Sequence, residues 1–370
     1  MILIQSSLMT KGDNAGTEDF LLLLPKTELH VHMEACARPS TLKLLCSKYK
    51  EDETLPAYIE QAKAVGYKSM ADFFDTWKRV NNLIKTTEEL EMITAEYLED
   101  AAFMNCIYVE LNLNILRQLS KGLEPGKVIA AIKRAQKAAE SKYGIVSRTI
   151  LSISRDWDEE TALTVVEMAS KYRKDNVVGI DVSGDEREKP NKFYKHVFRQ
   201  AHKSGVKATA HAGENAGVQS VVSAVSETGV SRIGHGIDAA SNARIIKLLK
   251  NSDIAVEICA TSNFMLGHVR SLEAHPCKNL LRAGVSCTFN TDDPLLFGNN
   301  IYDEYRNVAQ SWQLTTEQIV QASRNGIRYS FLDSGCKREL MQEFDKKAGK
   351  CQREFNLITS LQPAFKTAAL

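Results

Sequence analysis

The chain has 370 residues, of which 44% are hydrophobic and 25% are charged, a composition that is ordinary for a globular protein. Its 47 lysine and arginine residues almost balance its 46 aspartate and glutamate residues, so no strong electric field draws it to nucleic acid or to an anionic membrane. The eight cysteines include no CxxC pair, which argues against cysteine-ligated zinc and a disulfide framework, and we expect reduced cysteines in a cytoplasmic protein.

At the N-terminus we expect no secretory signal. The apolar run Met1–Ile4 is short and lacks basic residues, and Leu21–Leu24 follows Asp19 with no cleavage site behind it. Nothing approaches the roughly 18 consecutive apolar residues of a membrane span. We predict that residues 1–24 are a polar lead-in and that residues 25–370 form a single domain.

Short β-branched or apolar runs alternate with longer helical stretches along the chain. The runs predict eight strands, at Thr27–Val31, Cys106–Leu113, Val146–Ile153, Val177–Asp181, Lys207–Ala210, Arg232–Ile233, Ala255–Ile258 and Ser286–Phe289. Helices are expected between them, at Thr86–Met104, Gly126–Tyr143, Thr161–Tyr172, Asn191–Lys203, Gln219–Thr228, Asn242–Asn251 and Pro276–Ala283. This alternation predicts an α/β fold, a parallel sheet closed into a (β/α)8 TIM barrel.

Two parts of the chain exceed the simple alternation of strand and helix. The stretch from Pro39 to about Leu83 contains several helix-like pieces and is too long for one crossover, so we expect it to fold over the barrel mouth. Helices at about Ile301–Gln310, Thr316–Tyr329 and Lys337–Lys347 follow the last strand and should complete the outer ring.

Polar motifs stand where the predicted strands end. They follow strands one, four, five, six, seven and eight and are His30-Val31-His32, Asp181 to Glu186, His211 to Glu214, His235, Thr261-Ser262-Asn263 and Asp292-Asp293. In (β/α)8 barrels the chemistry sits at the carboxyl ends of the strands, because the following loops converge there. We therefore expect these motifs on one face of the barrel.

Three imidazoles and a carboxylate from these motifs predict a metal site of His30, His32, His211 and Asp292. Residues i and i+2 of a strand point the same way, so the first two histidines would project together. These ligands suit Zn²⁺, which makes hydroxide available from water at neutral pH. Taken alone, the histidines could be satisfied by hydrogen bonds, and Asp292 could cap a helix that starts at Pro294. Strand four ends in no lysine to bridge two metals, which favours one Zn²⁺ per chain.

Six segments form an ordered series along the chain. They are Glu28-Leu-His-Val-His-Met-Glu34, Gly179-Ile-Asp-Val-Ser-Gly-Asp-Glu186, His211-Ala-Gly-Glu214, Arg232-Ile-Gly-His-Gly236, Thr261-Ser-Asn263 and Asn290-Thr-Asp-Asp-Pro294. In order and spacing, this series resembles the adenosine deaminase family from about Leu24 to about Leu340. The resemblance implies a metal-dependent TIM-barrel enzyme that hydrolytically removes the 6-amino group of a purine and releases ammonia.

The resemblance and the chemistry together assign the catalytic groups. Attack at C6 places negative charge on the purine ring, and Glu214 is placed to deliver a proton to N1 as general acid. His235 would orient the attacking hydroxide and handle its proton. The alternatives are a first-turn carboxylate on the next helix for Glu214 and a satisfied buried histidine for His235.

Four further residues complete the predicted site. A protonated Asp293 would hydrogen-bond N7 of the purine, because adjacent carboxylates beside a metal favour one that ligates and one that holds a proton. Gly184 would give its backbone N–H to N3, and Asp181 would orient a neighbouring imidazole. Glu34 stands where adenosine-specific relatives usually carry aspartate, a position that in the family faces the ribose 5′ end.

The residues that would contact the ribose end of the substrate are indicated by weaker sequence patterns. Phe73, Phe74 and Trp77 are expected either to gate the ribose side or to pack on the barrel as one helix face. A 5′ phosphate is disfavoured, because Glu34 would repel it and no arginine or lysine cluster stands beside the motifs. Asn112 replaces an arginine of many relatives, which removes a charge near the site.

The sequence thus predicts a zinc-dependent deaminase that converts adenosine and 2′-deoxyadenosine to inosine and ammonia in purine salvage. The alternative substrates are adenine, 5′-methylthioadenosine and N6-substituted adenine nucleotides. From another class, the chain would be a nucleoside-binding protein without turnover, but binding alone does not need Glu214 and His235 together. The expected partner is a small purine nucleoside, neither nucleic acid nor membrane, and the oligomeric state stays open, a monomer included.

Overall fold

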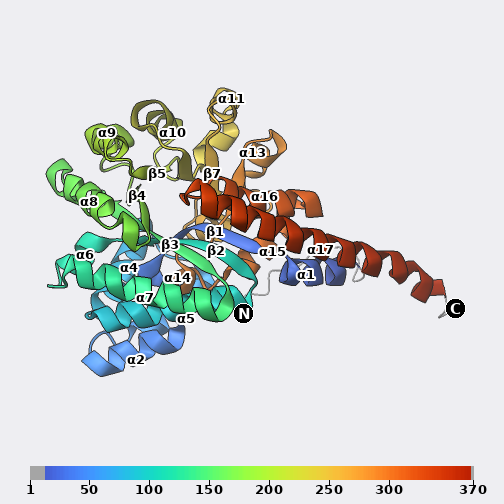
Figure 1. Ribbon diagram of the computed structural model, residues 1–370, viewed down its shortest axis with the longest axis horizontal. Helices are drawn as coiled ribbons and strands as arrows, with labels where there is room; N and C mark the ends of the chain where they lie inside the picture. The colour runs from blue at the N-terminus through green and yellow to red at the C-terminus, as the bar shows by residue number, and fades with distance from the viewer. Residues whose placement is uncertain (1–12, 368–370) are drawn as a thin grey trace.

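The computed structural model describes residues 13–367, and side-chain burial is described for residues 18–355. Its eight strands are parallel and follow one another around the sheet in chain order. They are β1 (Lys26–His32), β2 (Cys106–Leu113), β3 (Val146–Ser154), β4 (Val177–Ser183), β5 (Lys207–Ala212), β6 (Arg232–His235), β7 (Ala255–Ile258) and β8 (Cys287–Phe289). Helices surround the strands (Figure 1), and the predicted (β/α)8 barrel is confirmed.

The barrel closes between its first strand and the residues that follow its last. The His32 N–H donates to the Asp292 carbonyl at 2.8 Å, and the Asp292 N–H donates to the His30 carbonyl at 3.2 Å. Val31 and Asp292 form the corresponding parallel bridge. This closure brings a motif near the start of the chain beside one near its end.

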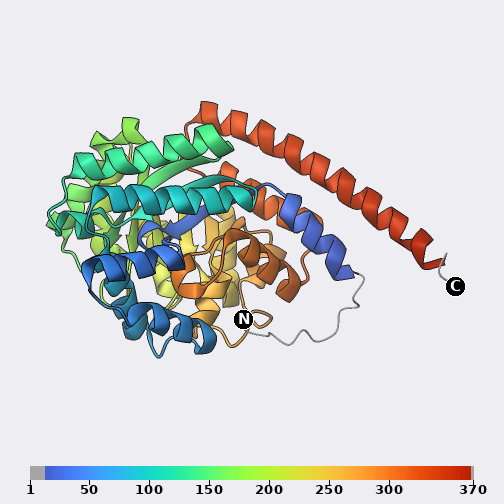
Figure 2. The same ribbon diagram turned by 90° about the horizontal axis from the view of Figure 1, so that it is seen from below.

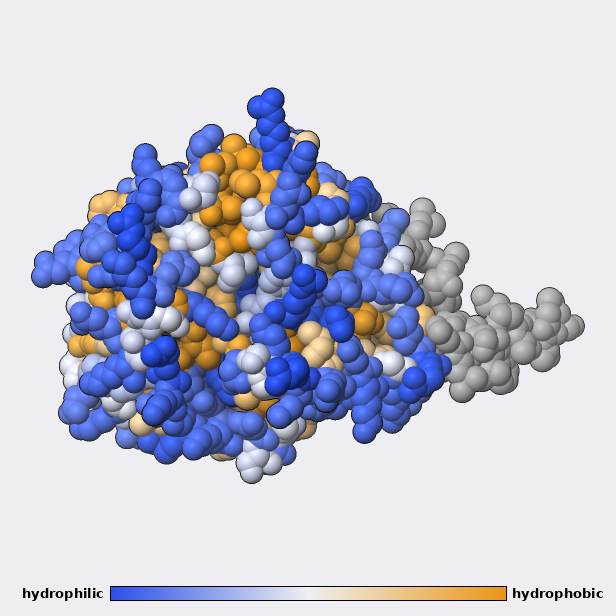
Figure 3. All heavy atoms as spheres, turned by 45° about the horizontal axis from the view of Figure 1, so that its top comes forward, coloured by the Kyte–Doolittle hydropathy of each residue, from blue (hydrophilic) through white to orange (hydrophobic). Residues whose placement is uncertain are grey.

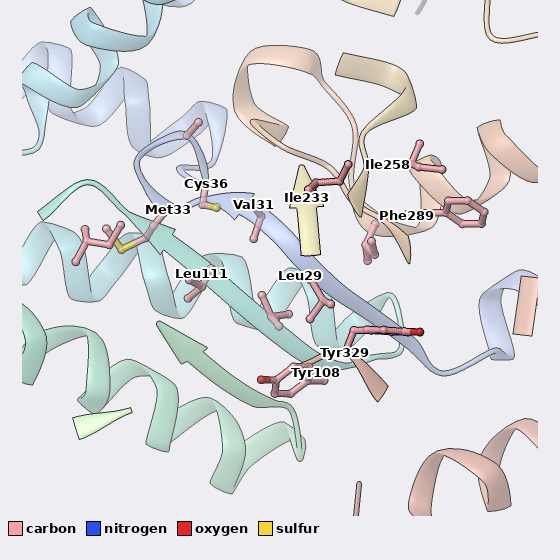
Figure 4. Packing of buried hydrophobic residues seen from close by; sticks show 14 of the residues in the cluster. Leu29, Val31, Met33, Cys36, Tyr108, Leu111, Ile233, Ile258, Phe289 and Tyr329 are labelled. Carbon is pink, nitrogen blue, oxygen red and sulfur yellow. The ribbon is translucent and has the colours of Figure 1, made fainter. Parts of the chain in front are cut away.

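The strands form because their side chains are buried on both faces. All eight residues of β2 are buried, as expected of a parallel sheet that helices cover. Figure 4 shows Leu29 and Val31 of β1 in this packing, with Leu111 of β2 and Ile233 of β6 nearby. A core packed in this way holds the strand ends, and the polar side chains on them, in fixed positions.

The helices of the outer ring begin and end at signals that the sequence carries. Thr86 and Glu89 form a reciprocal capping box at the start of one helix. Pro125 begins the next, and Gly144 ends it with a φ of +74°. The ring consists of α5 (Thr87–Phe103), α7 (Pro125–Tyr143), α8 (Glu159–Lys171), α9 (Lys195–Lys203), α11 (Ala243–Asn251), α13 (Lys278–Arg282), α15 (Ile301–Trp312) and α16 (Thr316–Arg328).

The long stretch after β1 forms α2 (Pro39–Tyr49), α3 (Leu55–Val65) and α4 (Met70–Leu83), which confirms the predicted extra helices. The hydroxyl of Ser69 caps α4 by accepting from the Asp72 N–H. Short helices also follow four of the strands: α6 (Ile115–Leu119), α10 (Val218–Ser223), α12 (Ala260–Met265) and α14 (Pro294–Phe297). These segments and α4 build the end of the barrel that carries the polar motifs.

The two ends of the described chain pack together outside the barrel. Helix α1 (Asp13–Leu23) contacts α15 and α17 (Ser334–Thr367), and its side chains Phe20 and Leu21 are buried. Helix α17 extends away from the barrel, with α1 beside it (Figures 1 and 2). Residues 1–12 of the predicted lead-in and residues 368–370 of the predicted domain lie outside the described residues.

The exterior is largely hydrophilic where Figure 3 shows it, with hydrophobic atoms in smaller patches between the charged side chains. Within the described part of the chain, no helix is both long and apolar enough to cross a bilayer. All eight cysteines are free, and all but Cys336 are buried. This agrees with the reduced cysteines that the sequence predicts.

Candidate active site

The four predicted metal ligands meet at the barrel mouth. His30 and His32 point the same way from β1, His211 projects from β5, and Asp292 follows β8. One ligand atom from each lies within 4.8 Å of the others. The Asp292 Oδ1 is 3.4 Å from the His30 Nε2 and 3.2 Å from the His32 Nε2. The His30 Nε2 is buried and has no hydrogen-bond partner among the described residues, which is what a metal-binding nitrogen requires before the metal binds.

A second set of donors shares two of these side chains, because His30 and Asp292 also lie close to His235 and Cys259. Burial raises the pKa of the Cys259 thiol well above its usual range, and the thiol group is 3.7 Å from the Glu257 carbonyl. A thiol that stays protonated is a poor metal ligand. The predicted set of three histidines and one aspartate therefore fits a metal better.

Three of the four predicted ligands contact a further side chain that can orient them. The Nδ1 of His30 lies 2.9 Å from Glu257 Oε2, and the Nδ1 of His211 lies 3.2 Å from Asp181 Oδ2. Ser262 donates its hydroxyl to the Asp292 Oδ2 at 2.6 Å. Asp181 thus contacts an imidazole, as predicted, whereas the sequence analysis did not find Glu257. Carboxylates behind metal-binding histidines fix the ring and its tautomer.

Glu214 lies in the turn after β5 and is held there by Glu186. The Glu186 carboxylate accepts from the Gly213 N–H at 2.9 Å and from the Glu214 N–H at 2.8 Å. Helix α10 begins later, at Val218 after Gly217, so Glu214 does not cap it. Burial raises the pKa of Glu214 well above its usual range. The carboxyl is therefore protonated at neutral pH and able to act as a general acid.

The tautomer of His235 follows from a chain of hydrogen bonds. The Cys277 N–H donates to the His275 Nδ1, so the Nε2 of His275 carries the proton and donates to the Asn263 Oδ1. This leaves the Asn263 amide N–H to donate to the His235 Nδ1 at 3.1 Å. Burial holds the pKa of His235 well below its usual range, so the ring is neutral and its proton is on Nε2.

A cavity with about 850 Å³ of empty space, part of it open to solvent, joins these groups. Its inner part is lined by His32, Gly184, His211, Glu214, His235, Asp292 and Asp293. Its outer part is lined by apolar side chains of α4 and the loop after α12, which are Met70, Phe73, Phe74, Trp77 and Leu266. Phe73 is buried against the core and also lines the cavity, so it packs on the barrel as one of the two alternatives expects, and a gate on the ribose side stays a prediction.

The two adjacent aspartates are in opposite protonation states. Burial and the neighbouring carboxylate raise the pKa of Asp293 well above its usual range. Burial alone would also raise the pKa of Asp292, but His30 and His32 outweigh it and hold that pKa well below its usual range. The Asp293 Oδ1 has no partner among the described residues. One carboxylate is thus charged for a metal, and the other holds a proton that can be donated.

Of the two predicted substrate contacts Gly184 and Glu34, only Gly184 lines the cavity. Gly184 lines the cavity with a φ of +101°, a conformation that favours glycine. Glu34 does not line the cavity: its Oε1 accepts from the Asn114 N–H at 2.8 Å and from the Gln118 amide at 3.3 Å. Its carboxylate holds the start of α6 in place, and its substrate contact stays a prediction that this geometry does not favour.

No arginine or lysine cluster was expected beside the motifs, and two basic side chains reach the cavity from other segments of the chain. Lys78 and Arg117 both line the outer part of the cavity. Arg117 forms an ion pair with Asp156, whereas Lys78 forms no ion pair with a described residue. These cations come from α4 and α6, which are far from the motifs in sequence, and nothing in the sequence alone indicates that they reach the site.

A methyl group at Gly234 should disturb the metal site. A Cβ atom there would lie 2.7 Å from Cε1 and 3.1 Å from Nδ1 of His30. We expect Gly234→Ala to displace the ring and to weaken metal binding by at least about tenfold, measured by zinc titration against a chelating dye. Gly349→Ala in α17 is the control, because alanine is favoured in a helix and should leave affinity unchanged. Equal affinities for both variants would contradict the placement of His30.

Comparison with known proteins decides the family. A family model described as adenosine deaminase matches residues 25–347. The chain belongs to the adenosine deaminase family. This places it among hydrolytic deaminases.

Curated relatives cover nearly the whole chain. The aminodeoxyfutalosine deaminase of Streptomyces coelicolor is 31% identical over 328 residues, 88% of this chain and 85% of the relative. The adenosine deaminase of Clostridium kluyveri is 30% identical over 330 residues, 88% of this chain and 94% of the relative. The names of the relatives thus differ in substrate.

Solved structures share the fold. The N6-mAMP deaminase of Arabidopsis has a TM-score of 0.79 and 26% identity, and the match covers 89% of this chain and 99% of that one. An amidohydrolase from Burkholderia ambifaria with bound Zn has a TM-score of 0.86 and 24% identity, with 96% and 97% covered. At this identity the second likeness concerns the fold alone.

Proposed function

We propose that the protein is a zinc-dependent deaminase that converts adenosine and 2′-deoxyadenosine to inosine and ammonia. One observation carries the proposal: Glu214, His235 and three of the four predicted metal ligands line the same cavity, and the fourth, His30, lies beside them. The two residues that binding alone does not need, Glu214 and His235, are in the states that catalysis needs. This supports an enzyme over a nucleoside-binding protein without turnover.

The donor set fits Zn²⁺. In their neutral forms His30, His32 and His211 would offer ring nitrogens and Asp292 a carboxylate oxygen, which is a donor set that zinc accepts with a position left for solvent. When it is bound, the ion activates water as the nucleophile. Without the ion, Asp292 raises the pKa values of His30 and His32, and a bound cation would take the place of the protons on these rings.

The residues of the chain perform the proton transfers and hold the purine. Glu214 gives its proton to N1 as charge develops on the ring, and the protonated Asp293 donates to N7. The Gly184 N–H donates to N3, where a larger residue would be strained by the positive φ. His235 presents an N–H on Nε2, so we propose that it orients the nucleophile by donating a hydrogen bond and receives a proton only later.

The lining of the outer part of the cavity favours a nucleoside as the substrate over free adenine. A purine fills the inner part, and the apolar wall that includes Phe74 and Trp77 would cover a ribose. The relatives named above differ in substrate, so we treat 5′-substituted adenosines as the second candidate. Lys78 favours that candidate, because it adds a cation at the outer end of the cavity where a 5′ phosphate would lie.

A panel of substrates tests the proposal. We would measure ammonia release and loss of adenine absorbance with adenosine, 2′-deoxyadenosine, 5′-methylthioadenosine, adenine and an N6-substituted adenine nucleotide. The proposal expects the highest kcat/KM with adenosine. A higher value with the nucleotide, together with a loss of that preference in Lys78→Gln, would establish the second candidate. No ammonia from any of them would reject deamination of 6-aminopurines.

The apolar wall predicts an effect on substrate binding. Trp77→Ala removes a ring that lines the outer cavity, so KM for adenosine should rise by about tenfold while kcat changes little. Phe103→Ala is the control, because Phe103 is an exposed aromatic at the end of α5 and does not line the cavity. An unchanged KM in Trp77→Ala would contradict the proposal that the ribose lies in this part of the cavity.

A further inference from the structure

A histidine outside the predicted motifs stands beside the proposed general acid. His268 lies in the loop after α12, where its backbone N–H donates to the Asn263 carbonyl at 2.9 Å. Its Nε2 is 3.6 Å from the Glu214 Oε1, and this nitrogen is buried with no hydrogen-bond partner among the described residues. The side chain as a whole is 15% exposed, so part of the ring reaches solvent.

The proton balance of the reaction requires a route to Glu214. This point rests on the proposed function, in which Glu214 gives a proton to N1 and the keto product keeps it. The attacking water gives up both of its protons in the hydrolysis. One proton leaves on ammonia, and the other makes up for the proton that N1 keeps in the product. Glu214 must therefore regain a proton in every turnover, although its carboxyl is buried and the cavity side is covered by substrate or product.

Two imidazoles lie near the Glu214 Oε1, and only one of them has its facing nitrogen free of a hydrogen bond to a described residue. The Nδ1 of His235 is 3.8 Å away, but it accepts a hydrogen bond from Asn263 and carries no proton. The Nε2 of His268 has no such partner. A shift of about half an ångström in the position of this side chain would bring Nε2 and Oε1 within hydrogen-bonding distance.

We propose that His268 is a positioning residue that passes protons from solvent to Glu214. The N–H bond at Nε2 breaks as an O–H bond forms on the Glu214 Oε1, and the ring takes a proton from water at Nδ1. The proton released from the nucleophile passes to another water molecule, so the number of protons in solution does not change. The step thus needs no co-reactant.

The surroundings of His268 suit a ring that both gives and takes protons. Burial lowers its pKa, and Glu186 acts in the opposite direction. The titratable groups that face the ring are Glu214, Glu186, Asp185, Arg187 and Asp292. Burial outweighs the carboxylates, so the ring is neutral at rest, the state in which imidazole can relay a proton.

The test separates the first turnover from the following ones. In His268→Gln, Glu214 is still protonated at rest, so rapid-quench measurements with adenosine should show a burst of about one product per site at the wild-type rate. Steady-state kcat should then be about 10- to 100-fold lower, with KM changed little. Free imidazole should restore kcat in His268→Ala, where the removed ring leaves space for it. His196→Gln is the control, because His196 is an exposed histidine on α9.

Each outcome is decisive. An unchanged kcat in His268→Gln, or a first turnover as slow as the later ones without rescue by imidazole, would overturn the relay. If the glutamine variant has a lowered unfolding midpoint, the alanine variant with and without imidazole gives the same comparison. A wild-type protein that deaminates no 6-aminopurine would reject the proposed function, whereas an active wild type with unaffected His268 variants would reject the relay alone.

Discussion

Replacing Glu214 by glutamine is expected to lower kcat by at least about 10³-fold while the protein keeps its metal. Glutamine has nearly the same shape and can still hydrogen-bond N1, but it has no acidic proton to transfer. Glu214 is not one of the four metal-ligating side chains, so metal content should stay at the wild-type level. Initial rates with adenosine and metal content by mass spectrometry measure the two effects.

A matched control keeps this prediction specific. Glu227→Gln changes the charge of a partly exposed side chain on the barrel segment that follows α10, and it should leave kcat unchanged. Wild-type activity should also fall as pH rises, because burial raises the pKa of Glu214 and only the protonated form is the acid. The acid role would be lost if Glu214→Gln kept more than about a tenth of the wild-type kcat.

Replacing Asp292 by asparagine is expected to remove both the metal and the activity. The carboxylate is the only negatively charged donor in the predicted set, and it lies against His30 and His32. Asparagine would leave three neutral nitrogens and a weak carbonyl ligand, so affinity should fall by several orders of magnitude. Metal content and ammonia release should both be close to zero.

Loss of the metal should also reduce stability. A metal that binds only the folded state stabilises it by about 4 kcal/mol at a thousandfold excess over Kd. Excess zinc should therefore raise the unfolding midpoint of the wild type and leave that of Asp292→Asn unchanged. Asp345→Asn, which alters an exposed ion pair with Arg324, should behave as the wild type. A midpoint of Asp292→Asn that rises with zinc as in the wild type would exclude Asp292 as a ligand.

The strands and the histidines and aspartate that cluster at their ends were predictable because they rest on local patterns. Alternation of buried runs with helical stretches located every strand, and two of them, Cys106–Leu113 and Ala255–Ile258, have the predicted bounds. Strands one, four, five and six were predicted too short; in β5 and β6 the missed residues include His211 and His235, which are polar. A polar side chain in a strand end lowers the apolar signal although the backbone pairing continues.

Features that depend on contacts between distant segments were not predictable. The helix Asn191–Lys203 was expected in one piece, but it is divided into a tight turn at Asn191–Tyr194 and α9, because Asn191 is buried against Arg155. Helix α1 is polar at its start and apolar at its end, and the burial of Phe20 against α15 and α17 is a tertiary effect.

The residues that support the site were not predictable either, because their contacts also join distant segments of the chain. Glu257 sits in a short strand, and its contact with His30 depends on barrel closure. His268 lies in the loop after α12, and its contact with Glu214 joins segments that are far apart in the chain. Lys78 and Arg117 reach the cavity from helices whose orientation over the barrel mouth no local pattern gives. A charged residue in a buried strand, such as Glu257, is the one signal of this kind that the sequence does carry.

The central claim is that one cation is bound by His30, His32, His211 and Asp292 at the barrel mouth. The most direct measurement is an anomalous difference map from a crystal of the zinc-loaded protein, with data on both sides of the zinc absorption edge. The account predicts a single strong peak among these four side chains, with Glu214 beside it and not bonded to it. Absence of a peak there, or a peak held by other residues, would contradict the account.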